Sequence, residues 1–209
     1  MLIRRTVLAA ALLLGWGALL PAAAAPVDDM PADAAKFVDG VVHQALTTLK
    51  DGSLSREERM KRMLDLYLEG FDTRSIGIFV LGVYAGRVRG DLLDEYIKEF
   101  RQYVIRQYFA RLELLGDQFT ITKTAPDGED IAWVTSALGS AGDKPYRVEW
   151  RVHKTDNGLR IFDVILEGTS LLWIQRNAFV NFLQQNGGDI EKLIAVMRVR
   201  KIGLDTPND

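Results

Sequence analysis

Residues 146–167 read Tyr-Arg-Val-Glu-Trp-Arg-Val-His-Lys-Thr-Asp-Asn-Gly-Leu-Arg-Ile-Phe-Asp-Val-Ile-Leu-Glu. Apolar and polar side chains alternate through the first half, where Tyr146, Val148, Trp150 and Val152 are interleaved with Arg147, Glu149, Arg151 and His153. A period of two is typical of a strand with one buried face. Asp156-Asn157-Gly158 is a tight-turn signal, so the chain is expected to return over 159–167 as a second, antiparallel strand.

Two further strands are expected upstream of this hairpin. Phe119 and Ile121 open the first, a turn follows at 125–129, and residues 131–138 form the second. Gly168 ends the series. The strands therefore predict a four-stranded antiparallel meander.

Helical periodicity surrounds these strands on both sides. Apolar residues three and four apart predict helices over 34–49, 55–68, 73–83, 91–115, 175–185 and 189–202. Ser55 and Glu58 form a capping-box pair, and the 73–83 helix is apolar nearly all round, so it must be buried or border something apolar. The pattern predicts an α+β fold with helices packed on one face of the sheet.

The first 24 residues are expected to be a cleaved signal peptide. Arg4 and Arg5 precede an apolar run over 7–20, and small residues at 22–24 supply the cleavage signal. The run is short for a membrane span, although an uncleaved anchor is the alternative. Residues 25–209 are then expected to form a single exported, periplasmic domain, with a helical half over about 34–116, a sheet over about 118–168 and C-terminal helices over about 175–202.

Composition narrows the function classes. The chain has 209 residues with 26 Lys+Arg against 28 Asp+Glu, so its net charge gives no general electrostatic attraction to nucleic acid. It has no cysteine and only two histidines, which removes thiol nucleophiles and cysteine-based metal sites and disfavours histidine-based zinc sites. Phosphate loops, zinc-protease helices and nucleophile elbows are absent from the sequence. No metal or cofactor is expected.

Asp163 is the one candidate for acid–base chemistry. It interrupts a strand that is otherwise apolar on both faces, and an apolar pocket can raise a carboxyl pKa into a useful range. The alternative is a structural aspartate that accepts backbone hydrogen bonds at a strand irregularity. His153 and His43 are interpreted as surface histidines.

The predicted helices and strands carry many bulky apolar residues, more than the formation of a core clearly requires. They indicate either a well-filled core or a helix-on-sheet wedge that holds an apolar ligand, and composition does not separate the two.

An ordered set of motifs covers roughly residues 35–200 and comprises Phe71-Asp72-x-x-x-Ile76-x-x-Phe79-Val80-Leu81-Gly82, Phe100-x-x-Tyr103-Val104, Phe162-Asp163-Val164, Glu167-Gly168-x-Ser170-Leu171, Arg176-x-x-Phe179 and Gly187-Gly188. This set resembles the toluene-tolerance family, the periplasmic lipid-binding MlaC proteins of Mla-type transport. Residues 172–177, with Trp-Ile-Gln-Arg at 173–176, resemble the hopanoid-associated HpnM branch more than the phospholipid-binding members.

The resemblance implies a monomeric carrier with a twisted, NTF2-like sheet around an apolar lipid cavity. Such a carrier would shuttle a phospholipid or hopanoid between an inner-membrane transporter complex and an outer-membrane lipoprotein or transporter complex, without catalysis. A small enzyme using Asp163 and an assembly protein without a ligand are the alternatives. Arg87 and Arg89 are expected to contact a head group or an acidic partner, unless their loop is merely solvated. The hypothesis assigns ten residues to the cavity wall: Phe71, Ile76, Phe79, Val80, Tyr103, Val104, Trp150, Val164, Phe179 and Phe182.

Overall fold

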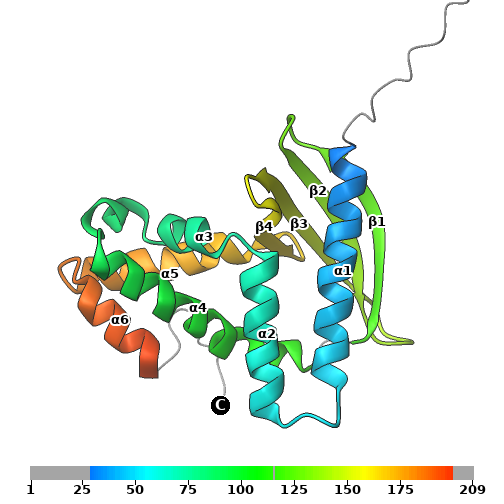
Figure 1. Cartoon of the computed structure of the whole chain (residues 1–209), viewed down its shortest axis with the longest axis horizontal. Helices are drawn as coiled ribbons and strands as arrows, with labels where there is room; N and C mark the ends of the chain where they lie inside the picture. The colour runs from blue at the N-terminus through cyan, green and yellow to red at the C-terminus, as the bar shows by residue number, and fades with distance from the viewer. Residues whose placement is uncertain (1–28, 115, 200–209) are drawn as a thin grey trace, which may run out of the picture.

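A computed structural model describes residues 29–114 and 116–199, and it has the expected α+β architecture (Figure 1). The helices are α1 (Met30–Lys50), α2 (Arg56–Gly70), α3 (Thr73–Val80), the 3-10 helix η1 (Gly82–Arg87), α4 (Asp91–Leu112), α5 (Leu171–Gln185) and α6 (Ile190–Val199). The strands are β1 (Gln118–Pro126), β2 (Ile131–Gly139), β3 (Tyr146–Thr155), β4 (Gly158–Leu166) and β5 (Thr169–Ser170).

The sheet is an antiparallel meander in the order β1-β2-β3-β4-β5. The four predicted strands are present, but the prediction of a four-stranded sheet is wrong by one short strand. Glu167 and Gly168 both have positive φ, 48° and 81°, and they turn the chain back so that Thr169 and Ser170 pair with the end of β4. Gly168 thus ends β4 without ending the sheet.

Helix α5 begins four residues earlier than the sequence pattern suggested. Ser170 is its N-cap, because the Ser170 hydroxyl accepts a hydrogen bond from the backbone N–H of Trp173 at 3.1 Å. The third predicted helix is shorter than expected, since Gly82 adopts a φ of 58° and the chain continues as η1. The capping box of Ser55 and Glu58 is confirmed at the start of α2.

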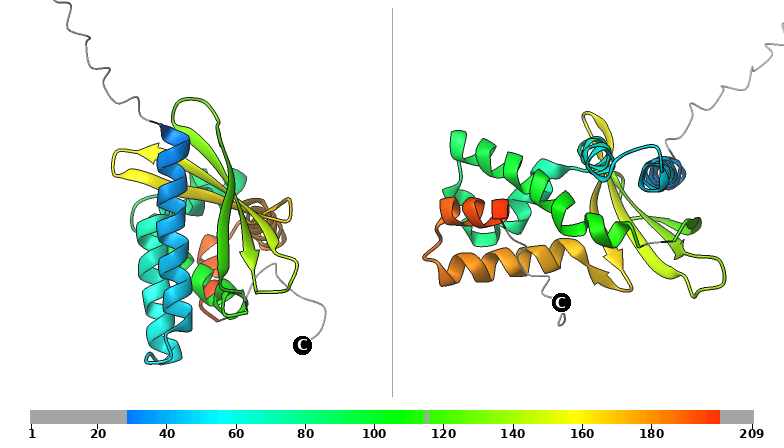
Figure 2. Two further views of the ribbon diagram at one scale, coloured as in Figure 1. Left: turned by 90° about the vertical axis from the view of Figure 1, so that its right-hand side faces the viewer. Right: turned by 90° about the horizontal axis from the view of Figure 1, so that it is seen from below.

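The helices divide into two groups around the sheet. Helix α1 lies across the face that carries Val134, Trp150 and Val152, and α2 runs beside it (Figures 1 and 2). Helices α3–α6 pack on one another and reach the sheet mainly at its β4 edge, through α3 and α5. An apolar cluster that includes Met63, Ile105 and Phe109 joins α2 to α4 and so connects the two groups of helices.

The turn between α2 and α3 fastens the helices to β4. Phe71 forms a parallel bridge with Ile161, and the Asp72 N–H donates to the Ile161 carbonyl at 2.9 Å. The Asp72 carboxylate caps α3 by accepting from the Ser75 N–H at 3.0 Å. Its other oxygen lies 3.1 Å from Nε2 of His153, which is therefore half-buried at the joint rather than a free surface histidine.

Asp163 makes the second attachment between β4 and the helices. A β-bulge in β4 lies opposite Arg151 and Val152, and Asp163 sits beside it with 5% of its surface exposed. The Asp163 carboxylate accepts from the Ser170 hydroxyl at 2.8 Å and from the Leu172 N–H at 3.3 Å. Both donors lie at the start of α5, which matches the interpretation of Asp163 as a structural aspartate at a strand irregularity.

Burial raises the pKa of Asp163 above its ordinary value of 3.8, because desolvation of the carboxylate outweighs its hydrogen bonds. The folded protein therefore binds this proton more tightly than the unfolded chain. The contribution of Asp163 to stability is greatest below its ordinary pKa and falls as the pH rises through the raised value.

An Asp163→Asn variant should remove this pH dependence. The melting temperature of the wild type, relative to the variant, should rise when the pH is lowered from about 7 to about 4. Thermal unfolding of both proteins by circular dichroism across that range measures the difference, and all other titrating groups cancel in it. A difference that does not change with pH would contradict the raised pKa.

Candidate functional site

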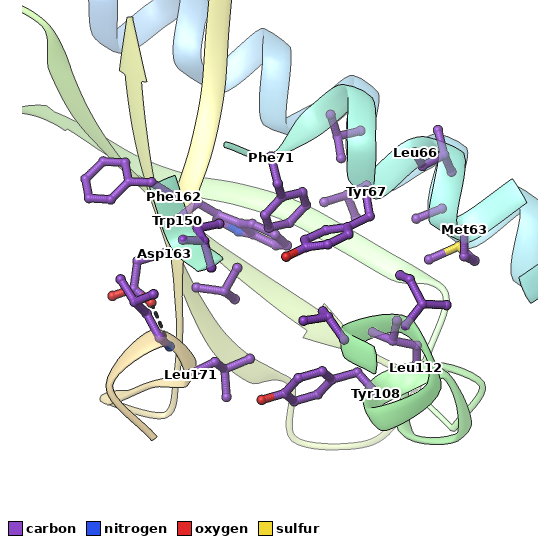
Figure 3. Close-up of a pocket in the computed structure, with 18 of the residues that line it drawn as sticks. Met63, Leu66, Tyr67, Phe71, Tyr108, Leu112, Trp150, Phe162, Asp163 and Leu171 are labelled. Carbon is purple, nitrogen blue, oxygen red and sulfur yellow. Dashed lines mark hydrogen bonds between the residues drawn. The ribbon is translucent and has the colours of Figure 1, made fainter. Parts of the chain in front are cut away.

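An apolar cavity of about 240 Å³ lies where α1, α2 and α4 meet the sheet, α3 and the beginning of α5. Its wall takes side chains from both helix groups and from β2, β3 and β4, so no single element forms it. Figure 3 shows several of these side chains converging from α2, α4 and the sheet. The labelled ones are Met63, Leu66, Tyr67, Phe71, Tyr108, Leu112, Trp150, Phe162, Asp163 and Leu171.

Several polar atoms of the wall are bound to other protein groups, whereas the Tyr108 hydroxyl and Gln175 Oε1 are buried without a hydrogen-bond partner in the part of the chain that the structure describes. Trp150 donates its indole N–H to the Ser136 hydroxyl at 2.9 Å, and Ser136 in turn donates to the Val148 carbonyl at 3.2 Å. Asp163 is held by Ser170 and Leu172 as described above. The surface offered to a ligand is therefore almost entirely hydrocarbon and aromatic, which suits an apolar molecule.

Tyr67 and Tyr108 face the cavity from α2 and α4 (Figure 3). Burial raises the pKa of Tyr108 to about 12 and also raises the pKa of Tyr67. Both phenols therefore stay neutral at physiological pH. They can donate or accept a hydrogen bond, but neither supplies a base.

Six of the ten residues predicted for the cavity wall line this cavity. They come from five different elements or turns and meet only in the folded chain: Phe71, Ile76, Val80, Val104, Trp150 and Val164.

The other four predicted residues lie outside the cavity wall, in or against the core of α3–α6. Phe79 packs against the Trp173 ring with centroids 5.3 Å apart, and Tyr103 packs against Phe179 at 5.5 Å. Phe182 is buried in the same core.

Sequence reasoning missed all of the wall contributed by α1 and α2. Ala45 and Leu49 of α1, with Met63 and Tyr67 of α2, lie on stripes that the periodicity identified as buried. The stripe shows that a face is covered but not whether a neighbouring helix or a cavity covers it. Gln175 of α5 is also part of the wall, but in the sequence it is followed by Arg176 and Asn177, and nothing there indicates that it is buried.

Arg87 and Arg89 lie far from the cavity. Arg87 is in η1 with its guanidinium 5.1 Å from the centre of the Tyr84 ring, and Arg89 donates to the Gly86 carbonyl at 3.2 Å. The connection between α3 and α4 is at the end of the helical group that is remote from the sheet (Figure 1). This placement favours a role in docking over contact with a head group in the cavity.

Neither a metal centre nor a transmembrane helix is found in the part of the chain that the structure describes. Within residues 29–114 and 116–199, no three His, Asp or Glu side chains group closely enough to hold a metal ion. No helix in these ranges is both long and apolar enough to cross a membrane.

Comparison with known proteins connects this cavity to a family. A solved structure of a phospholipid-binding protein from Ralstonia solanacearum, in complex with a phospholipid, matches with a TM-score of 0.69 and 20% identity. The match covers 79% of this chain and 94% of that one, and it supports the same fold. No curated protein matches the sequence.

The family model described as MlaC protein matches residues 39–199, most of the chain. MlaC proteins are lipid-binding carriers rather than enzymes, which excludes the alternative of a small enzyme that uses Asp163. The chain belongs to the MlaC family.

Proposed function

We propose that this protein carries a lipid through the periplasm with the apolar part of the lipid enclosed in the cavity between α1, α2, α4 and the sheet. The observation that carries the proposal is the wall itself, which is apolar and has its one carboxylate already hydrogen-bonded by Ser170 and Leu172. The fold it shares with the phospholipid-bound Ralstonia protein supports the assignment.

The energetics of lipid transfer explain why such a cavity suffices. Each methylene removed from water gains about 0.8 kcal/mol, so a lipid with roughly 30 methylenes does not cross water unaided at a useful rate. A hydrocarbon-like cavity makes the exchange with a bilayer nearly neutral. A carrier of this kind needs no catalytic group, metal or cofactor.

The cavity has to widen when it takes up a whole lipid. Its volume of about 240 Å³ is below the roughly 300–1,000 Å³ of pockets that enclose drug-sized ligands. Helix α2 is the element we propose to move, because it contacts the sheet less extensively than α1 does and is joined to α1 by the short connection 51–55.

The wider role proposed for the chain follows its family. The signal peptide expected at 1–24 lies outside the described residues, and we propose that residues 25–209 act as a monomeric periplasmic domain. The carrier would exchange a phospholipid or a hopanoid between an inner-membrane transporter complex and an outer-membrane lipoprotein or transporter complex. The HpnM-like segment 172–177 is the reason to include hopanoids. The presence of the cavity argues against the alternative of an assembly protein with a filled core.

Native mass spectrometry tests the proposal directly. The mature protein, produced with its leader in a hopanoid-producing Gram-negative host, should carry one lipid per chain, identified by organic extraction. A phospholipid would assign it to Mla-type traffic and a triterpenoid to the hopanoid branch. An unliganded mass that persists after incubation with both lipids would refute the carrier.

An Ala45→Trp variant should reduce lipid binding by filling the cavity from α1. Overpacking costs about 1–3 kcal/mol, which corresponds to a loss of about five- to 150-fold in affinity if the penalty falls on the bound state. Gln44→Trp, at the exposed neighbouring position, is the matched control and should retain the lipid. Lipid per folded protein is measured by extraction after circular dichroism has verified both folds. Equal lipid content in the two variants would place the ligand elsewhere.

Arg89→Glu should slow transfer several-fold while leaving the lipid content unchanged, because a charge at the rim of an interface acts mainly on the association rate. Transfer of labelled lipid from loaded protein to inner-membrane vesicles from the same host measures the rate. Lys123→Glu, on the exposed part of β1, makes the same charge change away from α3 and α4. Identical rates for the two variants would exclude Arg89 from docking.

A further inference from the structure

Gln175 is a buried polar side chain on the wall of an apolar cavity. It lies on α5 with 4% of its surface exposed. Its amide nitrogen Nε2 donates to the hydroxyl of Tyr103 at 3.4 Å. Its carbonyl oxygen Oε1 is buried and has no hydrogen-bond partner among the described residues. A buried acceptor without a donor costs free energy, so a ligand group that donates a hydrogen bond to Oε1 from the cavity would stabilise the complex.

The nearby polar groups do not provide that partner. Asp163 also borders the cavity, but its carboxylate oxygens are bound by Ser170 and Leu172 at the start of α5, and no hydrogen bond joins them to Gln175 Oε1. Trp150 directs its N–H to Ser136. The Tyr108 hydroxyl also lines the cavity, but it makes no hydrogen bond to Gln175 and is itself buried without a partner within residues 29–114 and 116–199. Most of the remaining wall consists of aliphatic and aromatic side chains.

The chemistry of the carboxamide limits what can pair with it. Acyl ester oxygens only accept hydrogen bonds and cannot satisfy Oε1. An ammonium group would donate, but it would bring a charge into an apolar enclosure. With Nε2 turned to Tyr103 and Oε1 left without a partner, a hydroxyl fits best, because it donates a hydrogen bond without bringing a charge.

We propose that Gln175 is a specificity-determining residue that hydrogen-bonds a hydroxyl group carried on the apolar body of the bound lipid. The inference rests on the proposed carrier function and adds to it the class of ligand: a hydroxylated lipid is preferred to one whose enclosed part is pure hydrocarbon. Gln175 positions no catalytic step. It distinguishes between ligands that the apolar wall alone would bind equally well.

A competition assay with paired probes tests this. Delipidated protein is loaded with cis-parinaric acid, and its fluorescence is followed as stearic acid or hydroxystearic acids with the hydroxyl at different carbons displace it. Wild-type protein should bind at least one hydroxy isomer about three- to tenfold more tightly than stearic acid, the range expected for one neutral hydrogen bond. Gln175→Met, which keeps the length of the side chain, should abolish or reverse that preference.

Gln184→Met, at an exposed position of the same helix, is the matched control and should keep the wild-type ratio. The melting temperature of Gln175→Met should change little, because the substitution removes the unpartnered Oε1 together with one long hydrogen bond to Tyr103. If that variant does not fold, Gln175→Leu takes its place. Equal ratios in wild type and variant, or no preference for any isomer, would overturn the role of Gln175. Failure of every probe to bind even the wild type would instead refute the carrier itself.

Discussion

The cavity depends on the way β4 holds the helices at two separate points. At one, the backbone of Phe71 and Asp72 bridges to Ile161; at the other, the Asp163 carboxylate holds the start of α5 through Ser170 and Leu172. The bulge in β4 lies between the two attachments. The α2–α3 turn and the start of α5 are thus both fixed to β4. Because of this, the helices cannot move together to fill the space above the sheet, and a pocket remains where a core would otherwise form.

Apart from Asp163, the charged side chains around this joint lie on the side of the sheet away from the pocket. The Arg151 guanidinium lies 5.0 Å from the centre of the Trp133 ring and 4.6 Å from that of Phe162, and it is 3.4 Å from the Asp127 carboxylate. His153 pairs with Asp72 at the sheet edge. The outer side of the sheet thus takes the ionic contacts, whereas the inner side stays available to hydrocarbon. This separation follows directly from the alternation of side chains along β3.

Alternation along the strands, the turn signals between them and the apolar periodicity of the helices predicted the meander and the helices, because these signals are local. Strand β5 was missed because two residues carry no period, and its pairing depends on the backbone of Glu167 and Gly168. The cavity wall was predicted in part. Phe71 and Phe179 are equally apolar in the sequence, and only the packing of α5 on α4 puts Phe179 in the core.

The position of Trp150 gives the protein an optical sensor of its own. Its indole ring forms part of the cavity wall and is 9% exposed, whereas Trp173 is 52% exposed on α5. Trp133 lies on the opposite side of the sheet beneath Arg151. Indole emission responds to the polarity around the ring, so the blue end of the tryptophan spectrum arises mainly from the residue that a ligand would touch. Filling and emptying of the cavity can therefore be followed in the unmodified chain by light alone.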